Sequence, residues 1–185
     1  MIRLVADSSC DVYTLPGVDF RAVPLHISTD DGRAFIDDPE LNVGEMVDCL
    51  HSYKGRSYTA CPSVAAWLEA FEGADTVYVV TITSGLSGSY NSAKVAADLY
   101  QQASPEASVH VFDSLSTGPE EFLLLEKLRE LVNAGLEFEE VIRQAEDYMR
   151  HTRLFFSLHS LHNLAQNGRI GKVTAAAVSV MNIRV

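Results

Sequence analysis

The segment from Thr83 to Ser92 contains residue types that are suited to binding an anion. It reads Thr-Ser-Gly-Leu-Ser-Gly-Ser-Tyr-Asn-Ser and lies between a β-branched run and a helical pattern. Glycines allow a backbone to turn tightly and to approach a ligand, and the free amides at a helix start attract negative charge. Ser87 can supply a hydroxyl donor or can cap the helix, and both interpretations stay open. For Ser89 and Ser92 we favour a capping role.

Two other segments carry hydroxyl or cationic side chains beside helix signals. Thr59-Ala60-Cys61-Pro62-Ser63 places hydroxyls and backbone amides at a predicted helix start. We interpret Ser63 as a first-turn hydroxyl without a ligand. Cys61 is interpreted as a buried or idle thiol, because the sequence positions no histidine to activate it. Asn167-Gly168-Arg169-Ile170 reads as a helix stop followed by a solvated arginine.

The motifs of several common enzyme sites do not fit this sequence. The pattern Gly-x-Ser-x-Gly would require a glycine where Ser89 stands, and neither a P-loop nor Gly-x-Gly-x-x-Gly occurs. His159 and His162 are three residues apart, but the sequence around them has no carboxylate. We therefore expect no metal and no cofactor. The alternative is an acyl or phosphoryl transferase, or a hydrolase, that uses a serine of residues 83–92.

Strand-like and helix-like segments alternate along the chain. Apolar or β-branched runs predict strands at residues 2–6, 20–27, 34–36, 76–82, 108–112 and 154–158. Periodic apolar residues predict helices at 43–50, 63–71, 93–99, 120–134, 137–151 and 161–165. The alternation predicts the α/β class, with a layered α/β/α domain and a mostly parallel sheet.

Polar residues follow three of the predicted strands at the point where each strand ends. They are Asp7-Ser8-Ser9, Thr83-Ser84-Gly85 and Asp113-Ser114. The carboxyl ends of parallel strands meet at one edge of a sheet, where α/β proteins bind their ligands. We therefore expect small hydroxyl groups to gather there and to suit an anionic or hydroxylic head group.

The charge distribution is asymmetric along the chain. The net charge is −11, and all 25 acidic residues lie at or before Asp147, whereas the remainder of the chain carries only basic charges. An acidic total without a basic face argues against nucleic-acid binding. We interpret the basic end as a piece of a larger surface, with an interaction module that docks a partner as the alternative.

Cysteine spacing and hydropathy indicate the cellular compartment of the protein. The three cysteines are widely spaced and form no Cys-x-x-Cys pair. No stretch reaches the ~20 consecutive apolar residues of a membrane span, and the first residues lack the apolar core of a signal peptide. We therefore predict a cytoplasmic protein with reduced thiols and no membrane span.

Six short motifs resemble those of the DegV family in order and spacing. They are Val5-Ala6-Asp7-Ser8-Ser9-Cys10-Asp11, Val23-Pro24-Leu25 with Asp31-Gly32, Thr59-Ala60-Cys61-Pro62-Ser63, Ser84-Gly85-Leu86-Ser87-Gly88-Ser89-Tyr90-Asn91-Ser92-Ala93, Asp113-Ser114 and Asn167-Gly168-Arg169-Ile170. The resemblance covers essentially the whole chain. Its most specific part is Leu-Ser-Gly-Ser-Tyr-Asn-Ser-Ala, which begins at Leu86.

The resemblance implies an α/β domain, here residues 1–167, joined to a second, smaller C-terminal domain of which residues 168–185 are only the junction. It implies that a long-chain fatty acid such as palmitate is bound between the domains and is presented to a separate fatty acid kinase. It also implies that this chain has no catalytic residue of its own. By position, Thr59 and Ser87 donate hydrogen bonds to the carboxylate. The supporting residues are Ser63, Ser84, Gly88 and Arg169.

The sequence departs from the family pattern at three places. Cys61 stands where the family has glutamine, and Pro119 with two acidic residues replaces a small, glycine-rich run. The chain also stops at Val185, where family members continue into the second domain. We expect the apolar residues 173–180 to be uncovered as a result, and to cause dimerisation, aggregation or a disordered tail.

Overall fold

A four-stranded sheet forms the centre of the protein. The computed structural model describes residues 1–158 and 161–170. The strands follow the order β2-β1-β6-β7, and their bounds are Ile2–Asp7 for β1, Asp19–Val23 for β2, Thr76–Thr81 for β6 and Ser108–Asp113 for β7. All neighbouring pairs in this sheet are parallel. The prediction of a mostly parallel sheet is therefore confirmed for this part of the molecule.

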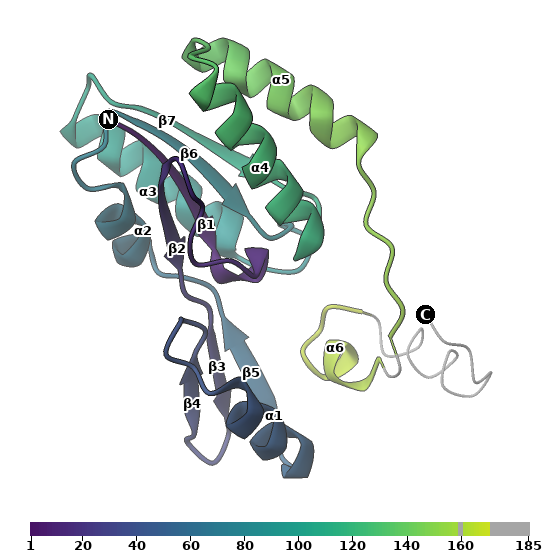
Figure 1. The fold of residues 1–185 in the computed structure, drawn as a ribbon. Helices are drawn as coiled ribbons and strands as arrows, with labels where there is room; N and C mark the ends of the chain where they lie inside the picture. Colours follow the sequence, from purple (N-terminus) through teal and green to yellow (C-terminus); the bar gives the residue numbers. More distant parts are fainter. Residues whose placement is uncertain (159–160, 171–185) are drawn as a thin grey trace.

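Two pairs of helices cover the two faces of the sheet (Figure 1). The first pair is α2 (Val64–Phe71) with α3 (Ser89–Ala103), and the second is α4 (Pro119–Asn133) with α5 (Phe138–His151). Side chains of β1 alternate between these layers. Leu4 and Ala6 belong to the cluster under α4 and α5, while Val5 belongs to the cluster under α2 and α3. The predicted α/β/α layering is confirmed.

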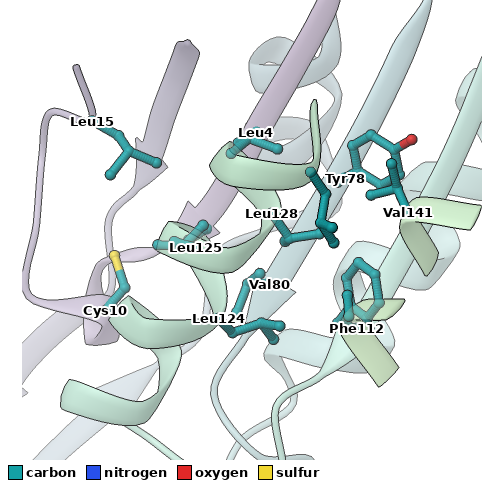
Figure 2. Close-up of a cluster of buried hydrophobic side chains, with 13 residues drawn as sticks. Leu4, Cys10, Leu15, Tyr78, Val80, Phe112, Leu124, Leu125, Leu128 and Val141 are labelled. Atoms are coloured by element: carbon teal, nitrogen blue, oxygen red, sulfur yellow. The ribbon is translucent and has the colours of Figure 1, made fainter. Parts of the chain in front are cut away.

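The core under α4 is built from leucines at helical spacing. Leu124, Leu125 and Leu128 extend from one side of α4 toward the sheet, in the same cluster as Leu4 and Val80 (Figure 2). None of these five side chains is more than 2% exposed. Burial of each leucine stabilises the folded state by roughly 1.5–3 kcal/mol, so α4 is held firmly against the strands whose ends form the candidate site.

A second, antiparallel sheet stands beside the first (Figure 1). Its order is β4-β3-β5, with bounds His26–Thr29 for β3, Ala34–Ile36 for β4 and Ser57–Ala60 for β5. The helix α1 (Val43–Ser52) connects β4 to β5, and the Asn42 side chain caps it by accepting a bond from the Glu45 N–H. The strand predicted at 34–36 is confirmed as β4, whereas β5 was not predicted.

The single strand predicted at 20–27 is wrong, because the structure divides it between the two sheets. Pro24 has no N–H and cannot donate to a strand ladder. The next amide, of Leu25, instead donates to the Ser8 hydroxyl at 3.0 Å. The Leu25 carbonyl accepts from the Asp37 N–H at 2.9 Å. These two bonds turn the chain from β2 into β3.

The strand predicted at 154–158 is also wrong. These residues form an irregular segment between α5 and α6 (His162–Gln166) (Figure 1). A strand needs a neighbour that satisfies its backbone groups, and in the described part of the chain no strand pairs with this segment. Phe155 and Phe156 are accordingly 89% and 65% exposed. The short helix predicted at 161–165 is confirmed, one residue further along.

Some expectations fall on residues that the structure does not describe. The apolar stretch 173–180 lies outside the described residues, and so do His159 and most of the predicted junction 168–185. Of the helices that are described, none combines the length and the apolar character needed to cross a membrane.

Candidate functional site

The polar ends of β1, β6 and β7 meet at one edge of the parallel sheet. The carboxylate of Asp113, at the end of β7, accepts a bond from the Ser84 N–H at 3.0 Å. The Thr83 N–H donates to the Ser116 carbonyl at 2.8 Å. The loops that follow β6 and β7 are thereby joined to each other, as the sequence predicts for the carboxyl edge of a parallel sheet.

Asp7, the last residue of β1, is fully buried beneath this edge. Its carboxylate accepts bonds from the hydroxyls of Ser89 and Ser9 and from the Ile82 N–H. Burial raises the pKa of Asp7 because it penalises the charged form, while these donors act in the opposite direction. Asp7 therefore braces the ends of β1 and β6 against the start of α3.

Ser87 lies in the turn between β6 and α3, half-buried. The turn is closed by the Leu86 and Ser87 amides, which both donate to the Thr83 carbonyl. The Ser87 hydroxyl oxygen accepts a bond from the Ser89 N–H at 3.2 Å. A hydroxyl that accepts one bond still has a proton to donate. Capping and anion binding are therefore compatible roles for Ser87.

The segment before α2 touches the start of α3. The Ser92 hydroxyl donates to the Pro62 carbonyl at 2.7 Å. A Cβ placed on Gly88 would lie 3.3 Å from the Cys61 sulfur, so glycine at 88 permits this close approach. Two segments that are distant in the sequence thus meet, through Pro62 and Cys61 on one side and Gly88 and Ser92 on the other.

Thr59 lies two residues before this contact, in a different place from the one that the sequence suggests. It belongs to β5, where it pairs in register with Ile27, and its side chain is exposed. Thr59 is therefore on a strand of the second sheet and not at a helix start. The described hydrogen bonds do not link Thr59 to Ser87 directly; the segments that carry them are joined through the Ser92–Pro62 bond.

Ser63 is the N-cap of α2, as its predicted first-turn position suggests. Its hydroxyl oxygen accepts a bond from the Ala66 N–H at 3.2 Å. Ser63→Ala is expected to lower the free energy of unfolding by about 1 kcal/mol, because an N-terminal amide of the helix loses its partner. Chemical denaturation measures this loss, and Ser63→Asp, which retains a capping oxygen, should recover most of it. An unchanged midpoint for Ser63→Ala would contradict the capping role.

Arg169 is brought to the site by the segment that follows α6. Its Nε donates to the Leu86 carbonyl at 3.2 Å, immediately before Ser87, and its Nη1 donates to the Asn167 carbonyl at 2.7 Å. Arg56, which precedes β5, donates to the Gln166 carbonyl at 2.9 Å. The two arginines therefore hold this segment between the second sheet and the loop of Ser87.

An open cleft of about 720 Å³ borders the same loops. Its apolar lining comes from Leu86, Leu115, Met149, Leu154 and Phe156. Its polar lining comes from the residues after β6 and β7, from the end of α5 and from the segment that follows α5. This cleft could not be predicted from the sequence, because its wall includes Leu154 and Phe156, which were predicted to belong to a strand.

Leu115 has an unusual backbone conformation at the rim of this cleft. Its φ is +57°, which is uncommon for a residue other than glycine, and its side chain is 75% exposed. The Asp113 carboxylate accepts from the Leu115 N–H at 3.2 Å, and the Ser114 hydroxyl accepts from the Ser116 N–H at 3.0 Å. These side-chain bonds hold the leucine outward, where it adds apolar surface beside Leu86.

The described residues offer no obvious metal site. Across residues 1–158 and 161–170, no three His, Cys, Asp or Glu side chains are arranged so that they could hold a metal ion. This edge presents hydroxyls, backbone amides and Arg169, and the lining of the cleft adds Arg150 and Arg153 together with the carboxyl groups of Glu120 and Glu146. The hydroxyls, amides and arginines can bind an anion, and the apolar wall of the cleft can contact the apolar part of an amphiphile.

The entire sequence is similar to known proteins. The profile of a family described as "Uncharacterised protein, DegV family" matches residues 1–185. A DegV domain-containing protein of Streptococcus pneumoniae is 42% identical over 186 residues, which cover 98% of this chain and 66% of that protein. The chain thus spans about two thirds of the length of the curated relatives it matches.

Two solved structures share this fold closely. A DegV family protein from Eubacterium eligens, loaded with heptadecanoic acid, is 53% identical with a TM-score of 0.93, over 100% of this chain and 67% of that one. The Streptococcus pneumoniae Fatty Acid Kinase (Fak) B3 protein, loaded with linoleic acid, is 42% identical with a TM-score of 0.93, over 99% of this chain and 66% of that one. With the family profile matched from the first residue to the last, this chain belongs to the DegV family.

Proposed function

We propose that this chain forms the carboxylate-binding part of a long-chain fatty-acid-binding protein. The observation that carries the proposal is that Ser87, Arg169 and an apolar cleft lie at one edge of the sheet. Leu86 connects them: it precedes Ser87, its carbonyl accepts a bond from Arg169, and it lines the cleft. Ser87 and Thr59 donate hydroxyl hydrogen bonds to the carboxylate. The supporting groups are Ser84 and Gly88 in the loop, Ser63 as the cap of α2, and Arg169.

Both the polar and the apolar groups of such a site would contribute to the free energy of fatty-acid binding. Each hydrogen bond to a charged carboxylate contributes roughly 1.5–3 kcal/mol, and each methylene removed from water contributes about 0.8 kcal/mol. An acyl chain therefore supplies most of the binding free energy, while the hydroxyls fix the position of the head group. The fatty acids in the relatives from E. eligens and S. pneumoniae support this assignment of ligand class.

We further propose that the protein presents its fatty acid to a separate kinase and does not transform it. The similarity to the Fatty Acid Kinase (Fak) B3 protein supports this partner class. A cytoplasmic location fits such a role, and the unpaired state of Cys10, Cys49 and Cys61 supports a reducing compartment.

The alternative of a serine-based transferase or hydrolase needs a base that takes the proton of Ser87. The bond that the Ser87 oxygen accepts comes from a backbone N–H, which is a donor and not a base. A fluorophosphonate probe separates the two functions. We expect no covalent label on Ser87, and stoichiometric labelling at this residue would favour the enzyme.

Lipid analysis of the purified protein tests the proposed function. Native mass spectrometry of protein isolated from bacterial cells should detect an added mass that corresponds to one long-chain fatty acid, and extraction should release that acid. Protein that is free of lipid after purification and that also fails to bind added palmitate would overturn the proposal.

A further inference from the structure

Two buried carboxyl groups share one hydroxyl beneath the candidate site. Asp7 ends β1 and Glu121 lies in the first turn of α4, and both side chains are fully buried. The Ser9 hydroxyl oxygen lies 2.7 Å from Glu121 Oε1 and also contacts Asp7 Oδ1. Among the described residues, neither carboxyl group forms a salt bridge with a basic side chain. The function proposed above assigns no role to Glu121.

The hydrogen count requires one of these carboxyl groups to be neutral. Ser9 has a single hydroxyl proton, and ionised carboxylates can only accept hydrogen bonds. If both were ionised, Ser9 could satisfy one of them, and the other contact would place two acceptor oxygens together. A proton on Glu121 resolves this, because Glu121 then donates to Ser9 and Ser9 donates to Asp7.

Burial raises the pKa of both carboxyl groups, and we assign the shared proton to Glu121 because of the other groups that contact each of them. Asp7 receives two further donors, the Ser89 hydroxyl and the Ile82 N–H, which favour its ionised form. Glu121 Oε2 is buried without a hydrogen-bond partner in the described part of the chain. Burial, followed by the charge of Asp7, raises the pKa of Glu121 to about 9.

We propose that Glu121 is a positioning residue, which acts through Ser9 and Asp7 to fix the loop that carries Ser87. The connection continues from Asp7 to Ser89, whose hydroxyl donates to the Asp7 carboxylate. The Ser89 N–H in turn donates to the Ser87 hydroxyl oxygen. The ligand-binding consequence rests on the proposed function, whereas the ordering of the loop does not. When Glu121 loses its proton, Ser9 can no longer serve both carboxylates, and the brace at the start of α3 weakens.

The direction of the pH dependence follows from the proton count. The titratable groups that face Glu121 are Asp7, Cys10 and Asp11, and none of them is basic. The carboxyl group has its ordinary pKa of 4.5 in the unfolded chain and a raised one in the folded chain. The folded protein therefore keeps a proton that the unfolded chain releases between these two values. Stability is greatest below the lower value and falls as the pH rises toward the higher one.

Glu121→Gln tests this proposal, because the amide retains a donor but does not titrate. Denaturation between about pH 5.5 and about pH 8.5 should reveal that wild-type unfolding releases about one proton more than unfolding of the variant. Glu130→Gln, an exposed site on the same helix, should keep the wild-type slope. Infrared difference spectra should show a protonated carboxyl band in the wild type and lose it in Glu121→Gln. Equal pH slopes, or the absence of that band, would overturn the proposal.

A second variant tests the ordering of the loop independently of ligand binding. Glu121→Met keeps much of the side-chain volume but removes the donor, so hydrogen exchange of amides 84–89 should quicken by about tenfold or more, while Glu121→Gln leaves it near wild type. Unchanged exchange in Glu121→Met, or failure of both variants to fold, would contradict positioning by a donated hydrogen bond. The exchange measurement needs no lipid, so a protein that fails to bind palmitate would refute the proposed function alone.

Discussion

Replacing Ser87 by alanine is expected to weaken palmitate binding by roughly 10- to 100-fold, because a hydrogen bond to a charged carboxylate contributes about 1.5–3 kcal/mol. The hydroxyl lies at the start of α3, and its oxygen is already oriented by the Ser89 N–H at 3.2 Å. Its proton is therefore still available to be donated to a ligand. Competition with a fluorescent fatty acid measures the change in dissociation constant.

The control for this experiment is Ser104→Ala, at the opposite end of the same helix. Ser104 is exposed and is the C-cap residue of α3, so its replacement changes the same chemistry without touching the site. It should leave the affinity within about twofold of the wild type. A Ser87→Ala variant that binds as tightly as Ser104→Ala would remove Ser87 from the carboxylate site.

Thr59→Val, which has nearly the same shape, measures the contribution of the second hydroxyl. Thr59 is exposed on β5 and is separated from Ser87 by the Cys61–Gly88 contact. We expect its loss to reduce affinity, and the double variant shows whether both hydroxyls act on one ligand. Effects that do not add would indicate a shared carboxylate, since groups that contact a common partner are coupled.

Leu128→Ala is expected to lower the free energy of unfolding by about 2–5 kcal/mol, the largest effect on stability that we predict. The side chain is fully buried between α4 and the sheet (Figure 2). Its truncation removes apolar burial and leaves a cavity that close-packed neighbours fill only in part. Urea denaturation at neutral pH, monitored by circular dichroism, measures the loss.

Leu123→Ala provides a matched comparison on the same helix. Leu123 is 45% exposed, so the same truncation at this position should change the free energy of unfolding by no more than about 1 kcal/mol. Similar losses for the two variants would indicate that helix propensity, and not core packing, holds α4 in place.

The sequence predicts best the strands that are covered on both faces. All but one residue of β1 and of β6 is buried, whereas β7, at the edge of the sheet, is buried only at Val111 and Phe112. All three are rich in apolar residues and are therefore recognisable as strands. The strand β5 has four residues that are largely exposed, and its sequence therefore carries no apolar alternation. Residues 154–158 have a strand-like composition but no neighbour to pair with, and composition alone does not supply one.

The part of the candidate site that follows from parallel strand direction could be predicted from the sequence. The part that depends on contacts between residues far apart in the sequence could not. The meeting of polar strand ends follows from parallel strands. The pairing of Asp7 with Glu121 joins residues that are distant in sequence, and in the sequence Glu121 appears only as one of the acids after Pro119. Thr59 was placed at a helix start for the same reason, because its partner strand β3 lies far upstream.

The position of β1 in the middle of the parallel sheet has a consequence for how the protein is made. During synthesis, β1 can pair with β2 soon after both have emerged, with Arg3 opposite Asp19, but its other edge must wait for β6, where Ile2 pairs with Thr76. Its apolar face waits longer still, for α4. At roughly 5–20 residues per second this interval lasts on the order of ten seconds. We expect the nascent amino-terminal segment to be a substrate for ribosome-associated chaperones during that time.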